Sequence, residues 1–446
     1  MFKKVLIANR GEIALRIIRA CHELGISTVA VYSTADADSL HVKFADESVC
    51  IGPPTPSKSY LSMPALLSAA EITQADAIHP GYGFLSENAQ FARACFEQDV
   101  HFIGPSPDVI DAMGNKVRAK EVARQAGVPL LPSVDARQDI SKIKKELKNI
   151  GYPVLIKAAM GGGGRGMKLV KEESQIEAAL ELAKSESLSA FGSDEIYIEK
   201  YCVKPRHIEF QILADQHGNV IHLGERDCSI QRRHQKLLEE ASSPIMDAGL
   251  RAKMGETAVA AAKSVNYSNV GTVEFIVDAD KNFYFLEMNT RIQVEHPVTE
   301  MITGIDLLRA QIESAAGQQL PFRQEDIRWK GHSIECRITA EDPMTFAPHP
   351  GRIQLFHPPA GLGVRLESVA CSDYMVPPFY DSMIAKLIVH DESRPRAIAK
   401  MRQALSEFVI QGIKTTIPLH REILENSDFC EGRYDTSFLT QLRPSL

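Results

Sequence analysis

Two glutamates on a predicted β-hairpin are the first residues that suggest chemistry. In the segment VEFIVDADKNFYFLEMN the turn is expected at Asp280-Lys281, and counting outward from it places Glu274 opposite Glu287. Like charges directly opposite each other destabilise a sheet, so a cation is expected to compensate them. Mg²⁺ prefers carboxylate oxygens, and Asn289 offers a third oxygen on the same strand face as Glu287. The alternative is a pair of solvated glutamates in another register.

Charged residues close to this hairpin in the sequence suggest an anion site. The stretch TRIQVEHPVTE brings Arg291, Glu295 and His296 directly after the candidate metal ligands. A charged stretch is usually a solvated face, but beside a metal–phosphate site it favours a catalytic role. Upstream, the segment DCSIQRRHQKLLEE concentrates basic side chains, and such a local cluster predicts anion binding. These basic residues are Arg232, Arg233, His234 and Lys236.

A glycine-rich loop in KAAMGGGGRGMKLV indicates where phosphate would bind. A P-loop is excluded because Gly166 is followed by Met167 and not by Lys and Ser or Thr. Gly161, Gly163 and Gly166 match the dinucleotide-binding spacing, but short strands are predicted on both sides and the helix begins only near residue 172. A strand–glycine loop–strand hairpin is typical of a flap over phosphates. An ordinary glycine-rich loop is the alternative.

The first hundred residues must position part of this site. They alternate between predicted strands (KVLIAN, STVAVYS, ADAIHPG, VHFIGPS) and helices such as GEIALRIIRACHELG, which indicates a parallel sheet. Ligands bind at the carboxyl ends of such strands, so HPGYGFLSEN, residues 79–88, is expected on a functional edge. An ordinary turn is equally compatible with that segment.

Further elements follow in a coarser pattern. One helix is predicted over DVIDAMGNKVRAKEVARQAG, and a proline-marked link over residues 128–133 precedes a helix over residues 172–184. RHIEFQILAD and VIHLGERDCSIQ are predicted as paired strands. After a polar break near residue 330, strands return, and RPRAIAKMRQALSEFVIQG is predicted as a helix.

Composition limits the classes of protein that fit. The chain has 446 residues, 44% of them hydrophobic, and a net charge of −7, so nothing favours binding to nucleic acid or to an acidic membrane. No apolar run approaches a membrane span, and charged residues interrupt any signal-peptide core at the N-terminus. Eight cysteines are scattered without C-x-x-C pairing, which predicts reduced thiols, a cytoplasmic location and no zinc site.

Taken together, these segments resemble the biotin carboxylase family of ATP-grasp enzymes, over essentially the whole chain. KVLIANRGEIALRIIRA, HPGYGFLSEN, GGGGRGMK, RHIEFQ, ERDCSIQRRHQK, EMNTRIQVEHPVTE and ECRI stand in family order. The resemblance implies an N-terminal parallel-sheet α/β domain (1–113), a central ATP-grasp domain (114–330) and a C-terminal domain with an antiparallel sheet (331–446). It also implies a mobile glycine-rich lid at about 131–203.

The resemblance assigns roles to many residues. It implies that Lys236 and Arg291 hold bicarbonate near the backbone of Val294, that Glu295 is the general base, and that Arg337 stabilises the enolate-like oxygen of biotin. Without the family, the alternative for Arg337 is a structural ion pair with a neighbour such as Glu335. The implied ligands of Mg²⁺, or of Mn²⁺ in its place, are Glu274, Glu287 and Asn289. The implied ATP contacts are Lys116, Lys157, Gly163, Gly164, Glu199, Lys200, Tyr201, Cys202, His207, Gln231 and His234.

The implied reaction is ATP-dependent carboxylation of biotin by bicarbonate through carboxyphosphate. The family includes free-standing subunits of bacterial acetyl-CoA carboxylase, which this chain resembles and which act in fatty acid synthesis by way of malonyl-CoA. No Met-Lys-Met biotin-attachment motif occurs in the sequence, so we expect biotin on a separate carrier protein, together with a separate carboxyltransferase. A homodimer is implied by the family resemblance alone.

Three other interpretations stay open. The chain could serve a pyruvate or a propionyl-CoA carboxylase, it could be another ATP-grasp ligase that joins a carboxylate to an amine, or it could be a non-catalytic nucleotide-binding subunit.

Overall fold

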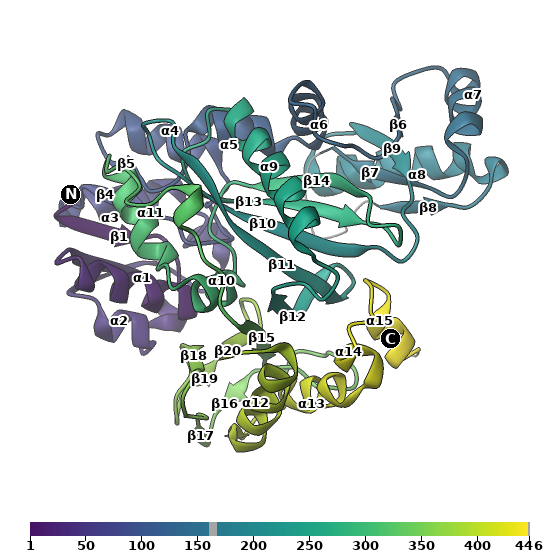
Figure 1. The fold of residues 1–446 in the computed structure, drawn as a ribbon. Helices are drawn as coiled ribbons and strands as arrows, with labels where there is room; N and C mark the ends of the chain where they lie inside the picture. Colours follow the sequence, from purple (N-terminus) through teal and green to yellow (C-terminus); the bar gives the residue numbers. More distant parts are fainter. Residues whose placement is uncertain (160–166, 445–446) are drawn as a thin grey trace.

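The computed structural model describes residues 1–159 and 167–444, and its N-terminal part is built on a parallel sheet (Figure 1). The strand order is β3-β2-β1-β4-β5, which confirms the predicted parallel α/β arrangement. The strands are β1 (Lys4–Ile7), β2 (Ser27–Ser33), β3 (Glu47–Gly52), β4 (Ala77–His79) and β5 (His101–Phe102). The helices are α1 (Gly11–Glu23), α2 (Leu40–Phe44), α3 (Met63–Thr73), α4 (Ala89–Glu97) and α5 (Pro107–Gly114).

The loop between β4 and α4 is held in a fixed shape by local contacts. Asn9 donates from Nδ2 to the carbonyl oxygens of Pro80, at 2.7 Å, and Tyr82, at 2.8 Å. Gly81 has a φ of +62°, and a Cβ there would lie 2.8 Å from the Asn9 amide nitrogen, so a side chain is excluded on two counts. Asn88 caps α4 by accepting from the Phe91 backbone N–H. The segment 79–88 is therefore a built loop at the carboxyl end of β4.

A smaller sheet forms the predicted lid, with the order β6-β9-β7-β8. β7 and β8 pair antiparallel, with Val154 opposite Val170, so the strand–loop–strand prediction is confirmed. The glycines between them, including Gly163 and Gly164, lie outside the described residues. The elements are β6 (Ser133–Val134), α7 (Ile140–Ile150), β7 (Val154–Ala158), β8 (Lys168–Val170), α8 (Ile176–Phe191) and β9 (Ile196–Lys200). The helix predicted over 172–184 thus starts and ends later than expected.

The central sheet carries most of the candidate site and has the order β14-β13-β10-β11-β12-β15-β20-β18, with antiparallel neighbours throughout. β12 pairs with β15, so the sheet continues across the boundary predicted near residue 330. Its strands are β10 (Arg206–Ala214), β11 (Val220–Arg232), β12 (Gln235–Ala241), β13 (Asn269–Val277), β14 (Phe283–Asn289), β15 (His332–Thr339), β18 (Val364–Ser368) and β20 (Met383–Asp391). Helices α9 (Ala248–Ser264), α10 (His296–Thr303) and α11 (Leu307–Ala315) pack against it.

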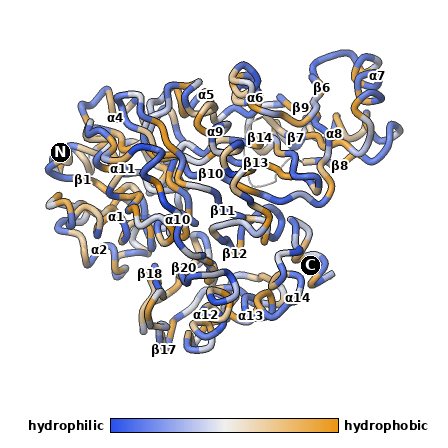
Figure 2. Tube along the Cα trace, viewed as in Figure 1, coloured by the Kyte–Doolittle hydropathy of each residue, from blue (hydrophilic) through white to orange (hydrophobic). Residues whose placement is uncertain are grey.

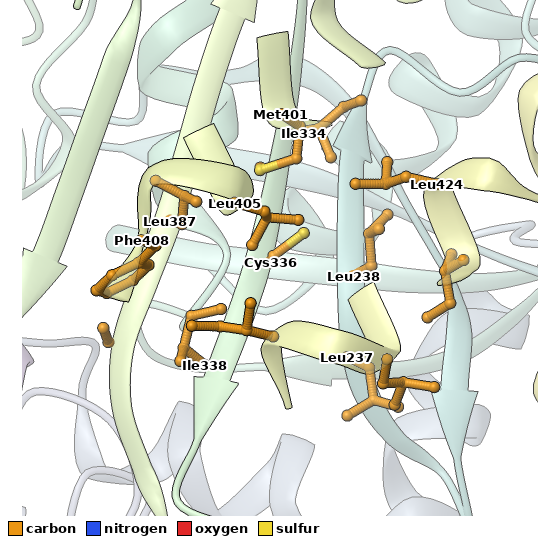
Figure 3. Close-up of a cluster of buried hydrophobic side chains, with 14 of the residues drawn as sticks. Leu237, Leu238, Ile334, Cys336, Ile338, Leu387, Met401, Leu405, Phe408 and Leu424 are labelled. Carbon is orange, nitrogen blue, oxygen red and sulfur yellow. The ribbon is translucent and has the colours of Figure 1, made fainter. Parts of the chain in front are cut away.

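The C-terminal part packs helices against one face of β12, β15 and β20. Figure 3 shows Ile334, Cys336 and Ile338 of β15 meeting Met401 and Leu405 of α12 in a buried apolar cluster. Its elements are β16 (Gly351–Arg352), β17 (Leu355–His357), β19 (Met375–Val376), α12 (Arg394–Glu407), β21 (Val409–Gln411), α13 (Ile417–Glu425), α14 (Ser427–Cys430) and α15 (Phe438–Leu442). The helix predicted over 394–412 is wrong at its end, because residues 409–411 pair with β17 as a strand.

A second helix prediction is also wrong, and the difference matters for the site. The stretch 108–127 is broken at Asn115 into α5 and α6 (Lys116–Gln125). The Asn115 side chain accepts from the backbone N–H groups of Val117 and Arg118, which caps α6. Lys116 therefore stands at the first position of a helix and not in the middle of one.

The hydropathy of the chain follows this layout. Figure 2 shows hydrophobic stretches along β1 and β10, whereas the loop that joins β6 to α7 is mostly hydrophilic. Within residues 1–159 and 167–444, no helix is long and apolar enough to cross a membrane.

Candidate active site

A cavity of about 900 Å³ lies where the lid, the central sheet, the N-terminal loops and the C-terminal part meet. Tyr82 and Gly83 of the 79–88 loop line it, so that loop does reach the site. Two charged residues singled out from the sequence pattern, Arg233 and His296, do not line this cavity, whereas Arg232 does. The described residues to which the family resemblance assigns roles all line it. They are Lys116, Lys157, Glu199, Lys200, Tyr201, Cys202, His207, Gln231, His234, Lys236, Glu274, Glu287, Asn289, Arg291, Val294, Glu295 and Arg337.

Three carboxylates form a row across neighbouring strands, and two of them, Glu274 and Glu287, line the cavity. Glu209 of β10 lies opposite Glu274 of β13, which lies opposite Glu287 of β14. The predicted pairing of Glu274 with Glu287 is confirmed, although the turn differs from the prediction. The loop spans 278–282, and its register alone would place Glu274 opposite Leu286; a bulge next to Glu274 shifts the partner to Glu287.

Side-chain cations compensate this row. Lys236 Nζ lies 2.6 Å from Glu209 Oε2 and 2.9 Å from Glu274 Oε1, and Lys116 pairs with Glu287. His207 Nε2 lies 3.0 Å from Glu274 Oε2. Burial alone would raise the pKa of Glu274, but Lys236 and His207 outweigh it and hold that pKa well below its ordinary value. Glu274, in the middle of the row, is therefore an ionised carboxylate.

Sequence reasoning missed Glu209 and its second partner, Arg226. The Arg226 side chain is fully buried, with Nε 2.5 Å from Glu209 Oε1 and Nη2 2.6 Å from Gln293 Oε1. A signal was present, because Glu209 is two residues from His207 and so shares its strand face.

A chain of ion pairs joins Lys236, Glu295 and Arg337. Lys236 Nζ lies 2.7 Å from Glu295 Oε1, and Arg337 Nη2 lies 2.9 Å from Glu295 Oε2. Glu295 is 2% exposed and immediately precedes α10. Burial would raise its pKa, but Lys236, Arg337 and Arg226 outweigh burial and lower the pKa far below the ordinary value. Glu295 is therefore an ionised acceptor with a strong positive field around it.

Arg337 has a second anionic partner that the sequence did not reveal. Its Nε donates to Glu239 Oε1 at 2.6 Å, whereas no ion pair between Arg337 and Glu335 occurs in the described part of the chain. The single-partner ion pair considered from the sequence is thus replaced by a guanidinium held between Glu239 and Glu295.

Arg291 is positioned from the N-terminal part. Glu87 Oε2 accepts from Arg291 Nε at 2.8 Å, and Glu87 Oε1 accepts from the Thr290 backbone N–H at 3.2 Å. Asn289 Oδ1 accepts from Arg291 Nη2 at 3.1 Å. Glu87 lies in the 79–88 segment, so the topology of the parallel sheet could have suggested it.

The other end of the cavity carries lysines around a buried acid. Glu199 pairs with Lys157, as well as with Lys120, which sequence reasoning missed. Burial opposes ionisation of Glu199, but Lys157 and Lys120 prevail and lower its pKa to about 2. Lys200 donates to the carbonyl oxygens of Gly151 and Tyr152, both at 3.1 Å, which ties β9 to the start of β7.

Fold and site together define an ATP-grasp enzyme. Residues 115–323 match the family model "Carbamoyl-phosphate synthase L chain, ATP binding domain". Residues 1–110 match "Biotin carboxylase, N-terminal domain", and residues 335–441 match "Biotin carboxylase C-terminal domain".

Individual proteins agree with these models. Biotin carboxylase 1 of Bacillus subtilis is 55% identical over 442 residues, covering 98% of both chains. A pyruvate carboxylase subunit of Methanothermobacter thermautotrophicus is 54% identical over 445 residues, which are 99% of this chain and 90% of that one.

A solved structure agrees as well. The biotin carboxylase domain dimer of the Hydrogenobacter thermophilus 2-oxoglutarate carboxylase, in complex with MgADP, ADP and bicarbonate, superposes with a TM-score of 0.95 at 51% identity. The superposition covers 99% of this chain and 98% of that one. The chain belongs to the biotin carboxylase family.

Proposed function

We propose that this chain carboxylates biotin with bicarbonate at the expense of ATP, through a carboxyphosphate intermediate. The observation that carries the proposal is the Lys236–Glu295–Arg337 chain in the same cavity as Lys116 and Lys157. A basic acceptor flanked by two cations suits an anionic, proton-bearing substrate next to a phosphoryl donor. Membership of the biotin carboxylase family supports the same reaction.

ATP is assigned to the lysine-rich end. Lys116 and Lys157 bind its phosphates, with Gly163 and Gly164 of the lid loop, and each lysine is already poised beside a carboxylate. Phosphate oxygens replace those carboxylates as partners, so binding exchanges one ion pair for another. The adenine lies against β9 and its end, and the remaining pocket residues surround it. These residues are Glu199, Lys200, Tyr201, Cys202, His207, Gln231 and His234.

Mg²⁺ fits the oxygen set of β13 and β14. Glu274, Glu287 and Asn289 present two carboxylates and an amide oxygen on adjacent strands, which is the donor chemistry that this hard cation prefers, and Mn²⁺ accepts the same ligands. Bound there together with ATP, the metal would neutralise charge on the phosphates. Lys116, which pairs with Glu287, is also an assigned phosphate ligand, so ATP binding frees Glu287 for the metal.

Bicarbonate lies between Lys236 and Arg291, near the backbone of Val294, and gives its proton to Glu295. The low pKa of Glu295 makes it a weak base in the free enzyme. Bicarbonate is itself an anion, so it takes over part of the positive field of Lys236, and the basicity of Glu295 rises when the substrate arrives. Arg291 and Lys236 then stabilise charge on the transferring phosphoryl group.

In the second step the C–O bond of carboxyphosphate breaks to give CO₂ and inorganic phosphate. The phosphate takes the proton of the ureido N–H, and the nitrogen bonds to CO₂. Arg337 stabilises the negative charge that develops on the ureido oxygen, a task suited to a permanently charged planar guanidinium. Glu239 and Glu295 hold this guanidinium between them.

Partners and location are part of the proposal. Biotin is carried by a separate carrier protein, a carboxyltransferase completes the reaction, and the chain works as a cytoplasmic homodimer. The dimer formed by the Hydrogenobacter domain supports the proposed homodimer. The acceptor we favour is acetyl-CoA, giving malonyl-CoA for fatty acid synthesis. Pyruvate is the second candidate, because the pyruvate carboxylase protein of Methanothermobacter is 54% identical to this chain; propionyl-CoA is a further alternative within the same reaction type.

The test is ATP hydrolysis with Mg²⁺, measured with and without bicarbonate and free biotin. Hydrolysis that requires bicarbonate and rises with biotin supports the proposal. Hydrolysis indifferent to both would instead indicate another ATP-grasp ligase, and no hydrolysis would indicate a nucleotide-binding subunit. Transfer from a purified carboxybiotin carrier to acetyl-CoA, pyruvate or propionyl-CoA then identifies the acceptor.

A further inference from the structure

Two buried glutamates stand directly behind Arg337, outside the cavity. Glu239 of β12 and Glu335 of β15 are opposite each other in the antiparallel register, and both are fully buried. Directly opposed side chains on a sheet share one face, with Cβ atoms about 5 Å apart. Neither residue belongs to the lining of the cavity.

Three oxygens of this pair have no hydrogen-bond partner among the described residues. Glu239 Oε1 accepts from Arg337, but Glu239 Oε2 and both oxygens of Glu335 are buried and unpaired. Two buried anions at this separation would repel each other strongly. A single proton between the pair removes the repulsion and supplies a donor.

The cations nearby are committed elsewhere. On β20, Lys386 lies opposite Arg337, and its Nζ contacts Val294 O at 2.9 Å and Glu12 Oε1 at 3.1 Å. The other charged or titratable groups on the elements around Glu335 are mostly acids or neutral groups. They include Glu239 on β12, Glu295 and His296 at α10, Glu367 on β18, Glu12 on α1 and Tyr82 in the β4–α4 loop. Two arginines also lie on these elements, and both are paired with other acids. Arg16 of α1 pairs with Glu300 and Asp306, and Arg365 of β18 pairs with Glu300 and Glu367.

The opposite face of β15 offers no alternative partner. Figure 3 shows Ile334, Cys336 and Ile338 pointing into the apolar cluster beneath α12. The charged group of α12 that approaches this face, Arg394, is bound to Glu240 at 2.7 Å.

We infer that Glu335 is a protonated carboxylic acid that donates its O–H to Glu239 Oε2, and that it thereby positions Arg337 for biotin. Of the two glutamates in the pair, Glu239 is the ionised one, because Glu239 and not Glu335 contacts the Arg337 guanidinium. A hydrogen bond to the charged form stabilises that form, so neutral Glu335 keeps Glu239 anionic and Glu239 keeps Arg337 in place. The proton stays in the pair throughout the reaction.

The direction of the pKa shifts agrees with this geometry. Burial raises the pKa of Glu335 well above its ordinary value; Lys386 and Arg337 oppose this shift, whereas the negative charges of Glu239 and Glu295 reinforce it. Burial also raises the pKa of Glu239, to about 7, against the opposing effect of Arg337. Protonation of Glu239 at lower pH would therefore release Arg337.

Infrared spectroscopy tests the proton directly and needs no activity. At about pH 8, above the pKa of Glu239, the wild-type protein should show the carbonyl stretch of a buried carboxylic acid. That band should be lost in Glu335→Gln and retained in Glu392→Gln, a matched change at a side chain that is 82% exposed. A difference spectrum without that band would overturn the inference and leave the proposed function untouched.

Kinetics tests the positioning role, which rests on the proposed function of Arg337. Glu335→Leu fills similar space without a hydrogen-bond donor, so kcat/KM for free biotin should fall about tenfold. The acidic limb of the pH profile of kcat/KM should move to higher pH, because the pKa of Glu239 rises when the donor is lost. The KM for ATP should stay unchanged. Glu335→Gln keeps an N–H donor and should restore the wild-type limb. An unchanged limb in Glu335→Leu, or a limb moved to lower pH in Glu335→Gln, would contradict a neutral Glu335.

Discussion

Replacing Glu295 with glutamine separates its chemical role from its structural one. The change removes a proton acceptor and one negative charge while keeping size. Lys236 retains Glu209 and Glu274 as partners, and Arg337 retains Glu239, so no buried cation is left unpaired. The structural cost should then be small, within the about 1–3 kcal/mol expected for a lost buried hydrogen-bond partner.

The catalytic cost should be larger. General-base catalysis by a positioned side chain contributes about 10²- to 10⁴-fold in rate, equivalent to about 3–5 kcal/mol of transition-state stabilisation. We therefore expect bicarbonate-dependent ATP turnover to fall by about that factor in Glu295→Gln, without a comparable change in ATP affinity. The assay is ADP release at saturating ATP with varied bicarbonate, alongside nucleotide binding by calorimetry.

Thermal unfolding provides the control for a folding defect. A midpoint within a few degrees of the wild type, combined with the loss of turnover, would support the assigned base. Turnover within about twofold of the wild type would show that another group takes the proton, and the role given to Glu295 would be wrong.

Three further predictions concern charged side chains, one in the C-terminal part and two around the site. Glu240→Gln breaks a buried cluster in which Arg394 donates to both carboxylate oxygens, so the free energy of unfolding in urea should fall by about 3–5 kcal/mol at neutral pH. Burial opposes ionisation of Glu240, but its partners lower the folded-state pKa from 4.5 to about 2. The stabilisation is therefore fully present above about pH 4.5 and is lost as the pH falls towards 2. A loss of unfolding free energy in Glu240→Gln that persisted in acid would contradict this ion-pair origin. Glu87→Gln should raise the KM for bicarbonate about tenfold without changing that for ATP, because Arg291 loses its anchor; equal effects on both substrates would argue against a local role. Glu287→Gln should raise the Mg²⁺ concentration needed for half-maximal ATP turnover by about tenfold or more, and an unaltered Mg²⁺ titration would remove Glu287 from the ligand set.

Sequence patterns predicted the parts of the site that depend on strand alternation and turn chemistry. Period-two spacing is a local property, so the β13–β14 hairpin and the shared face of Glu287 and Asn289 follow from it. The turn position was wrong and the bulge beside Glu274 was not foreseen, and the two errors cancelled. Bulges depend on the packing of a whole sheet, which a single strand does not reveal.

Other features depend on long-range contacts and were not predictable from one sequence. Glu87 and Arg291 are separated by 204 residues, and Glu239 and Arg337 by 98, so no local pattern links them. The break between α5 and α6 is different, because the local sequence does encode it. Asn115 is of a residue type preferred at helix N-caps. Recognising it as a cap would have divided the predicted helix and placed Lys116 at a helix start.

The ion pairs of this site are better understood as preparation for substrate than as stabilisation of the fold. Buried ion pairs contribute little net stability, and well-packed apolar residues in their place are often as stabilising. A row of Glu209, Glu274 and Glu287, with Lys236 serving the first two, is therefore a poor solution for folding alone. It becomes useful when anions arrive, because each lysine can exchange a carboxylate for a phosphate or bicarbonate oxygen without first being stripped of water. Preorganised charge of this kind avoids solvent reorganisation during the reaction, which is where electrostatic catalysis has its largest effect.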